Sequence, residues 1–308
     1  MEINEVEKLE AVQIQGNRKS RKIRENRIFH LVNITLICFF TLIIIVPIWN
    51  IVVASFSNPD ALAKPGLRIW PEEFSLESYK LVFNDASIWN AFMISVLKTV
   101  IGVVTHVLFT AMVAYGMSKQ DLIGRNLYTA LGIGTMFFTG GMIPTFLLMK
   151  YLGLLDSFWV YIIPSLFSYY DMIIMMNFFR EIPASLEESA KIDGAGTWTI
   201  LSKIIMPLSM PVMATIALFN GVYQWNDYIT AKLYISNEAL YPIQMKLYEI
   251  IVSTQAQTIQ NSTSVVIPTS SESIQLATIV IATVPIVLVY PFLQKYFIKG
   301  MMIGAVKE

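Results

Sequence analysis

Six long apolar stretches constrain this chain more than any other feature. A helix needs about 20 predominantly apolar residues to cross the hydrocarbon core of a bilayer, where no water satisfies the backbone. The composition agrees, because 55% of the 308 residues are hydrophobic and only 14% are charged, whereas soluble domains are roughly a quarter charged. The sequence therefore predicts an all-α polytopic membrane protein with six transmembrane helices, expected at residues 31–54, 88–117, 127–149, 158–179, 204–225 and 274–298.

The basic residues indicate how these helices are oriented. If the N-terminus lies inside, inner segments hold 15 of the 22 Lys and Arg residues and outer segments hold six, while Lys98 lies within a span. Basic residues are enriched in cytoplasmic segments, so both termini are expected in the cytoplasm. A basic flank beside a membrane helix is commoner than a nucleic-acid patch, so we expect a bilayer and no nucleic-acid partner. The predicted divisions are a basic cytoplasmic segment, a permease domain and a cytoplasmic tail, at residues 1–30, 31–298 and 299–308.

Two long segments, 55–87 and 226–273, face outward in this topology. The second combines an amphipathic piece at 241–251 with a tract at 253–273 that is rich in Ser, Thr and Gln. Such a polar tract is ordered only where something holds it.

The inner segment 181–211 has the pattern of two short helices separated by a sharp turn. Pro183 suits the approach to a helix, and Ser185 with Glu188 three residues later forms a capping-box pattern. Gly194 is suited to end that helix in a left-handed conformation, and Thr197 to cap the next. The pattern favours neither of two roles, docking of another protein or packing against the chain's own bundle.

This segment resembles the EAA motif of ABC importer permeases. The matching residues are, in order, Glu188-Ser189-Ala190, Asp193-Gly194-Ala195, Ile204 and Pro207, with Ser189 in place of the first alanine. In that family the motif forms the coupling helix, which docks in a groove of the ATP-hydrolysing subunit. The resemblance thus implies that the ATPase-coupling residues are Glu187, Glu188, Ser189, Ala190, Asp193, Gly194, Ala195 and Pro207.

Three further runs, at 138–144, 224–227 and 296–304, look like those of carbohydrate-uptake permeases. They are similar to the branch containing maltose-type second permeases for complex oligosaccharides. The resemblance implies a type I ABC importer permease fold in the bacterial cytoplasmic membrane, and oligosaccharide import by alternating access. It also implies a second homologous permease, two ATP-binding subunits and a lipid-anchored or periplasmic solute-binding protein.

No Gly-x-x-x-x-Gly-Lys-Ser/Thr loop occurs in the sequence, so the chain is not expected to bind ATP. ATP and Mg are expected on the partner ATPase subunits, and no cofactor or metal on this chain. The lone cysteine, Cys38, lies in the first apolar stretch and provides neither a disulfide nor a metal-ligand spacing. Paired intramembrane carboxylates and the hydrolase motifs are also absent from the sequence, so no enzyme activity is expected.

Polar and aromatic residues in the fourth and fifth spans are candidates for the sugar path. An aspartate in lipid costs about 2.5 to 3.5 kcal/mol unless it faces a cavity or a partner, so Asp171 is a functional candidate. The alternatives are that Trp225 belongs to an interfacial belt and that Asp171 or Asn220 joins helices by hydrogen bonds. Lys98 is expected to reach the outer surface or meet an acidic sugar, and His106 to be a packing residue. The candidates are Tyr169, Tyr170, Asp171, Asn220, Tyr223, Gln224, Trp225 and Asn226.

Two other functions stay open at this point. One is an ABC importer for a non-sugar solute such as a peptide or phosphate. The other is an ATP-independent secondary transporter, against which stands the lack of a visible inverted repeat.

Overall fold

The computed structural model describes the whole chain except residues 1–2, 59–61, 63–65, 262–268 and 306–308, and it describes backbone only at 3–28, 257–261, 269–271 and 292–305. The described part is helical; its one β feature is an isolated bridge between Ser57 and Phe74. The helices are α1 (Ile3–Ser55), α2 (Glu77–Asn84), α3 (Ala86–Ser118), α4 (Arg125–Phe137), α5 (Met142–Tyr151), η2 (Phe158–Tyr161), α6 (Tyr169–Glu181), α7 (Ala184–Ile192), α8 (Thr197–Ile200), η3 (Leu201–Ile205), α9 (Met206–Leu208), α10 (Met210–Asn226), α11 (Ile229–Tyr234), η4 (Glu238–Leu240), α12 (Ile243–Asn261) and α13 (Thr269–Ala305).

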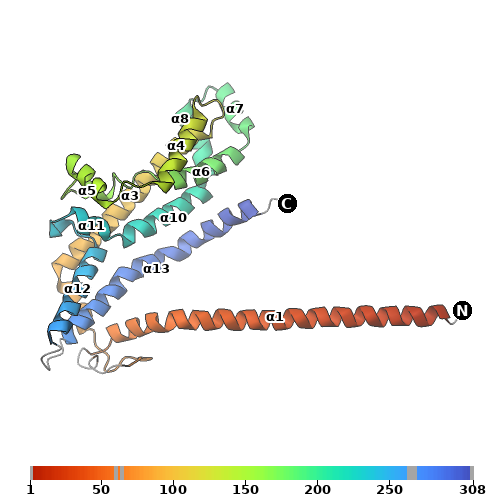
Figure 1. Cartoon of the computed structure of the whole chain (residues 1–308), viewed down its shortest axis with the longest axis horizontal. Helices are drawn as coiled ribbons and strands as arrows, with labels where there is room; N and C mark the ends of the chain where they lie inside the picture. Colours follow the sequence, from red (N-terminus) through yellow and green to blue (C-terminus); the bar gives the residue numbers. More distant parts are fainter. Residues whose placement is uncertain (1–2, 59–61, 63–65, 262–268, 306–308) are drawn as a thin grey trace.

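The main core lies where α3 packs against α6 and α10. Ala111 and Ala114 of α3 are fully buried there, because small side chains let helix backbones approach closely. Met172 and Met175 of α6 fill the space opposite them. In Figure 1, α7 and α8 lie at one end of this bundle, while α5, α11 and α12 lie towards the other.

The third predicted span, 127–149, is two helices and not one. α4 and α5 meet at an angle of 114°, with the break at residues 138–141. Gly141 has a φ of +85°, a conformation that costs other residues energy. The glycine pair at 140–141 was visible in the sequence, but the apolar content on both sides favoured a continuous helix.

The fourth predicted span, 158–179, is helical only in part. η2 ends at Tyr161, and α6 does not begin until Tyr169. Pro164 in the intervening segment lacks the N–H group that helix continuation needs. The Ser168 side chain caps α6 by accepting a hydrogen bond from the Asp171 amide at 3.3 Å. Irregular backbone at membrane depth is tolerated only where protein surrounds it or it lines a cavity.

The fifth predicted span, 204–225, is also bent. The helical run Thr197–Leu208 meets α10 at 81°, and the break falls at Ser209. Pro211 occupies the first turn of α10, where its missing N–H does no harm. Pro207 lies in α9, before the bend.

The structure contains three described helices long and apolar enough to cross a membrane, namely Phe29–Ser55, Ala86–Ser118 and Glu272–Pro291. The total rises to five if each bent pair counts as one span. The predicted span 158–179 is absent from this set because α6, at 13 residues, is too short by itself.

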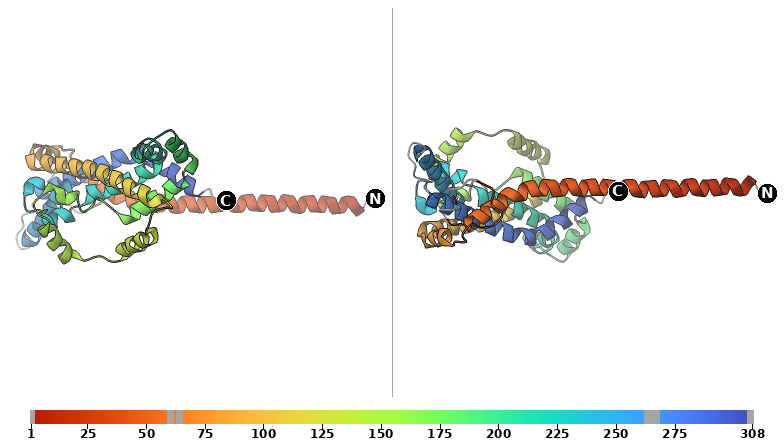
Figure 2. Two further views of the ribbon diagram at one scale, coloured as in Figure 1. Left: turned by 90° about the horizontal axis from the view of Figure 1, so that it is seen from above. Right: turned by 90° about the horizontal axis from the view of Figure 1, so that it is seen from below.

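The helix α1 extends away from the rest of the chain (Figures 1 and 2). Only 6% of its most apolar window is buried. Its C-terminal end is anchored, because Ser55 is fully buried and its hydroxyl lies 2.7 Å from the Tyr79 hydroxyl of α2. The predicted basic cluster before this span lies among residues whose side chains are not described.

The segment 226–273, predicted as a loop, is mostly helical where it is described. α12 contains most of the predicted amphipathic piece and continues into the polar tract. The Ile243 amide donates to the Ser95 hydroxyl of α3 at 2.8 Å, and Asn90 of α3 donates to the Ala239 carbonyl at 2.7 Å. These bonds fix the outer-segment helices on α3; residues 262–268 of the tract lie outside the described part.

Candidate functional site

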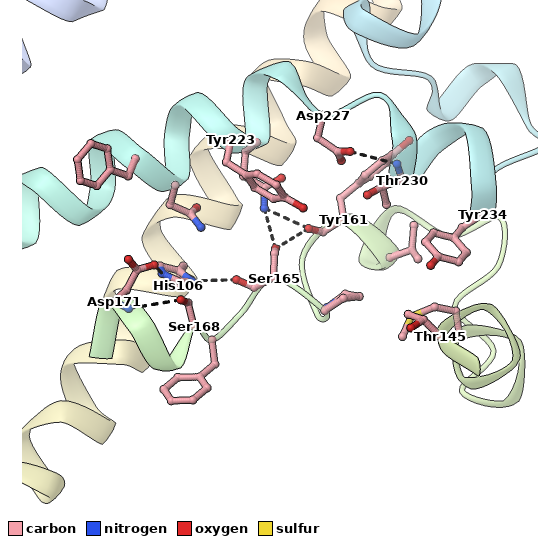
Figure 3. Close-up of a pocket in the computed structure, with 17 residues that line it drawn as sticks. His106, Thr145, Tyr161, Ser165, Ser168, Asp171, Tyr223, Asp227, Thr230 and Tyr234 are labelled. Atoms are coloured by element: carbon pink, nitrogen blue, oxygen red, sulfur yellow. Dashed lines mark hydrogen bonds and ion pairs between the residues drawn. The ribbon is translucent and has the colours of Figure 1, made fainter. Parts of the chain in front are cut away.

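A cavity of about 490 Å³ lies between α3, α6 and α10, and residues of α5, η2, α11 and the irregular segment before α6 also line it (Figure 3). This volume is within the range of ligand pockets, about 300 to 1,000 Å³. Its apolar lining includes Met149, Val160 and Phe219. Its polar and hydroxylated lining residues are His106, Thr145, Tyr161, Ser165, Ser168, Asp171, Asn220, Tyr223, Gln224, Asp227, Thr230 and Tyr234.

His106 joins α3 to two parts of the cavity wall (Figure 3). Its Nδ1 lies 2.8 Å from the Ser165 carbonyl oxygen, and its Nε2 lies 3.0 Å from Oδ2 of Asp171. Both nitrogens thus face acceptors, yet a neutral imidazole donates from one nitrogen only. The ring therefore ties α3 both to the irregular segment before α6 and to α6 itself. His106 is buried, as expected for a packing residue, and it also holds hydrogen-bond partners 59 and 65 residues away in sequence.

Gln224 of α10 is held at the cavity wall by the irregular segment. Its Nε2 donates to the Ser165 hydroxyl at 2.7 Å and to the Tyr161 carbonyl at 3.2 Å. Gly102 of α3 makes room for it, because a Cβ at that position would lie 2.8 Å from Nε2. The carboxamide is therefore fixed in one orientation.

Asn220 lies one turn before Gln224 on the same face of α10. Its residue surface is 8% exposed, and its Oδ1 is buried without a hydrogen-bond partner in the described part of the chain. An unpaired buried acceptor costs about 1 to 3 kcal/mol. A group in the cavity with a hydroxyl to donate would remove that cost.

Lys98 does not reach the surface, contrary to the first alternative considered for it, and it is not among the residues that line the cavity. Its side chain is fully buried, and Nζ donates to the Asp227 carbonyl at 2.8 Å and pairs with Asp227 Oδ2 at 3.3 Å. The ammonium also lies 4.7 Å from the centre of the Tyr161 ring. Asp227 Oδ1 accepts from the Thr230 amide at 3.1 Å at the start of α11, so Lys98 is tied to the junction between α10 and α11.

Four of the eight predicted path residues line the cavity, namely Asp171, Asn220, Tyr223 and Gln224. The other four lie elsewhere. Trp225 is buried against α13, where Nε1 donates to the Ala282 carbonyl at 2.9 Å, so it does not lie in an interfacial belt. Tyr169 packs over Gly132 of α4, while the exposed Tyr170 and Asn226 are not part of the cavity lining.

The residues that sequence reasoning missed come mainly from the breaks in the predicted spans. Ser165 reaches the cavity because the chain is not helical between Tyr161 and Tyr169. Tyr161 and Thr230 are positioned by η2 and α11, neither of which was predicted. Pro164 was the one available signal, since it argues against a helix continuing through this segment.

The segment 181–211 has the predicted helix, turn and helix, with different caps. Gly194 has a φ of +80° and ends α7 as expected. The capping prediction was wrong, because α7 begins after Pro183 and α8 after Gly196, and neither N-cap makes a side-chain hydrogen bond. The Ser185 and Thr197 hydroxyls therefore do not cap these helices.

The two adjacent glutamates of α7 have different surroundings. The Glu188 residue is exposed, whereas the Glu187 side chain is 17% exposed and pairs with Lys119 just beyond α3. The apolar residues Leu186, Ile192 and Trp198 are exposed in the same segment.

Comparison with known proteins places these features in a family. Residues 122–303 match the family model described as "Binding-protein-dependent transport system inner membrane component". The chain is 43% identical over 284 residues to the polygalacturonan/rhamnogalacturonan transport system permease protein YtcP of Bacillus subtilis, covering 92% of this chain and 99% of that protein.

It is 42% identical over 289 residues to the protein LplC of the same organism, covering 92% of this chain and 96% of the relative. The fold also matches a solved structure, a crystal structure of a bacterial ABC transporter involved in the import of the acidic polysaccharide alginate. The superposition on one chain of that transporter has a TM-score of 0.81 at 35% sequence identity. It covers 89% of this chain and 98% of the other. The chain therefore belongs to the family of inner-membrane components of binding-protein-dependent transport systems, the permeases of ABC importers.

Proposed function

We propose that this permease moves an oligosaccharide into the cell through the cavity between α3, α6 and α10, by alternating access driven by separate ATPase subunits. The observation that carries the proposal is a group of buried hydroxyl, carboxamide and carboxyl side chains inside an otherwise apolar bundle. Sugars present hydroxyls to such groups and apolar ring faces to aromatic side chains. The relatives' names add support, because they specify polysaccharide or alginate transport.

The charged groups of the cavity support a hydroxyl-based mode of recognition. Lys98 is paired with Asp227, and His106 with Asp171. Each pair satisfies itself, which leaves the uncharged lining residues, Asn220 and Tyr223 among them, to contact the solute. An acidic sugar would then obtain its counter-charge from the second permease.

A second, homologous permease completes the path. Phe219 and Tyr223 both line the cavity, yet their residue surfaces are 49% and 60% exposed. Aromatic side chains half exposed beside a polar cavity support a site that this chain lines on one side only. The largely unburied α1 offers further apolar surface to lipid or to that subunit.

The topology we propose has six crossings with both termini in the cytoplasm of a bacterium. The bent pairs each cross once, and the broken segment 158–179 crosses as η2, an irregular stretch and α6. This assignment keeps the chain divided into residues 1–30, 31–298 and 299–308. It places 55–87 and 226–273 outside, where they meet the lipid-anchored or periplasmic binding protein.

The segment 181–211 docks on one of two ATPase subunits, which bind ATP and Mg. The exposed face of α7 carries Glu188 and Ser189, and exposed Ile192 and Trp198 supply apolar contact area. Asp193, Gly194 and Ala195 form the turn, while Ala190 packs inward and Pro207 precedes the bend into α10. ATP binding then biases the outward-open and inward-open states of the cavity.

Reconstitution tests this proposal. The permease is purified with its co-expressed second permease and ATPase subunits, and placed in liposomes with the binding protein. Oligogalacturonates, oligoalginates and neutral malto-oligosaccharides are supplied separately. We expect ATP-dependent uptake of at least one of these sugars, and none by this chain alone. Uptake by the chain alone, or failure of any oligosaccharide to stimulate ATP hydrolysis by the complete complex, would contradict the proposal.

A further inference from the structure

The inner end of α3 and the helix α7 are connected by a cluster of Tyr115, Lys119 and Glu187. Lys119 Nζ forms an ion pair with Glu187 Oε2, and the Tyr115 hydroxyl donates to the same oxygen at 3.4 Å. The Lys119 ammonium also lies 4.0 Å from the centre of the Tyr115 ring. Two interactions therefore converge on one carboxylate of α7, and the third holds Lys119 against Tyr115.

This cluster is more protected than an ordinary surface ion pair. The side chains of Glu187 and Lys119 are 17% and 29% exposed, and Tyr115 is 5% exposed. Exposed pairs contribute about 0 to 1 kcal/mol, whereas partial burial lowers the effective dielectric and strengthens the attraction. Glu187 is thus turned inward onto α3, whereas Glu188 is exposed.

A second contact holds the same end of α3. Arg180, in the last turn of α6, donates from Nη2 to the Met117 carbonyl at 3.2 Å. The last carbonyls of a helix have no partner within it, so this bond satisfies one of them. The inner end of α3 is therefore bonded to both α6 and α7, the helices on either side of the short connection at 182–183.

The same helix forms part of the cavity wall. α3 runs without a proline or break from Ala86 to Ser118. His106 lies nine residues before Tyr115, which is roughly 13 Å along a helix axis. A displacement of α7 that carries the inner end of α3 would consequently move His106, and with it the bonds to Ser165 and Asp171.

We propose that Glu187 is a positioning residue of energy coupling, which fastens α7 to α3 through Lys119 and Tyr115 so that movement of α7 reaches the cavity. This inference rests on the proposed function, because it assumes that α7 receives the ATPase. It gives the two glutamates of α7 different roles: Glu188 faces the ATPase, and Glu187 faces α3 of this chain. Loss of Glu187 should uncouple ATP hydrolysis from transport without releasing the ATPase.

The test compares Glu187→Gln, Lys119→Met, the charge exchange Glu187→Lys with Lys119→Glu, and Glu188→Lys in the complete complex. The first readout is the amount of ATPase subunit that co-purifies. The second uses a cysteine introduced into the cavity, Thr145→Cys in a Cys38→Ala background. Its labelling by a water-soluble maleimide is measured with and without vanadate-trapped nucleotide. This readout needs no identified sugar. The third is sugar imported per ATP hydrolysed.

We expect Glu187→Gln and Lys119→Met to retain the ATPase and its hydrolysis, while the nucleotide-dependent change in labelling and the transport per ATP fall about fivefold or more. The charge exchange should restore both, and Glu188→Lys should instead lose the ATPase. Unchanged transport per ATP in Glu187→Gln, or loss of the ATPase from it, would overturn the inference. If the parent complex shows no nucleotide-dependent labelling, the proposed function itself fails and this inference fails with it.

Discussion

Some buried polar side chains in this bundle have hydrogen-bond or ion-pair partners within the chain, and others do not. His106 and Asp171 satisfy each other, and so do Lys98 and Asp227. Asn220 is different, because it lines the cavity and its buried Oδ1 has no partner in the described residues. Polar groups of the first kind fix helices relative to one another, while a group of the second kind is suited to bind a solute.

Replacement of Asn220 by leucine should weaken solute recognition more than it affects folding. Removal of a buried, unpaired acceptor loses no internal hydrogen bond, whereas the lost bond to a sugar hydroxyl is worth about 0.5 to 1.5 kcal/mol. We expect the KM for uptake to rise about three- to tenfold with little change in thermal stability. Uptake kinetics and a melting curve of the purified complex measure the two effects.

Asn226 provides the matched control. It lies on the same helix and is exposed outside the cavity, and its side-chain amide donates to the Val222 carbonyl at 2.9 Å. Asn226→Leu should leave the KM unchanged. An equal rise in KM for both variants would remove Asn220 from the path.

The turn after α7 depends on backbone conformation and not on packing. Gly194 has a φ of +80°, and a Cβ placed there would meet nothing within 4 Å. A left-handed conformation costs residues other than glycine roughly 1 to 2 kcal/mol, and a β-branched residue more. Gly194→Val should therefore unfold or redirect this turn, and we expect less co-purified ATPase together with lost uptake.

A valine at Gly196 serves as the control, because it adds the same side-chain volume as Gly194→Val without a left-handed backbone. Its φ of −73° is ordinary, and a Cβ at that position also meets nothing within 4 Å. Gly196→Val should retain the ATPase and transport. If both valine variants lose the ATPase to the same extent, the left-handed turn is not the cause.

The contact between α4 and α6 depends on one glycine. A Cβ at Gly132 would lie 1.9 Å from the Tyr169 ring, so Gly132→Ala forces the ring to leave its place or the two helices to separate. Overpacking of this kind costs typically about 1 to 3 kcal/mol. Thermal unfolding of the complex should show the loss, while Gly134→Ala, where a Cβ meets nothing within 4 Å, should not.

Shortening the opposing side chain should reverse the effect. In the double variant Gly132→Ala with Tyr169→Ala, the methyl group has room where the ring was. We expect it to be less destabilised than the sum of the two single variants. Strict additivity would show that the glycine matters for another reason.

The family, the apolar character of the bundle and the two helices of 181–211 were all predictable, because each follows from local patterns of hydrophobicity, glycine and proline. The breaks in 127–149 and 158–179 were not, since apolar content is the same for a continuous and an interrupted segment. Half of the predicted path residues lie outside the cavity for the same kind of reason. Which side of α10 holds Trp225 and which holds Gln224 depends on the positions of α3 and α13, and a single helix sequence does not encode those positions.

The number of crossings decides the topology of the chain, and the broken segment 158–179 is the critical one. Six crossings place both termini in the cytoplasm, together with 181–211. If 158–179 did not cross, Ser189 would lie outside, Ser253 inside and the termini on opposite faces. Both serines are exposed in the structure, so each is accessible to a reagent.

Single cysteines at Ser87, Ser189 and Ser253 in a Cys38→Ala background separate these topologies. With six crossings, a membrane-impermeant maleimide should modify Ser87→Cys and Ser253→Cys on intact cells, and Ser189→Cys only after permeabilisation. Unlabelled Cys38→Ala is the control, and Ser87, which precedes the disputed segment, should be outside in either case. Exchange of the Ser189 and Ser253 results would reject the six-crossing arrangement. It would also place α7 on the outer face of the membrane, away from any ATPase, because ATP is hydrolysed in the cytoplasm. The coupling role of 181–211 therefore depends on whether the segment 158–179 crosses the membrane.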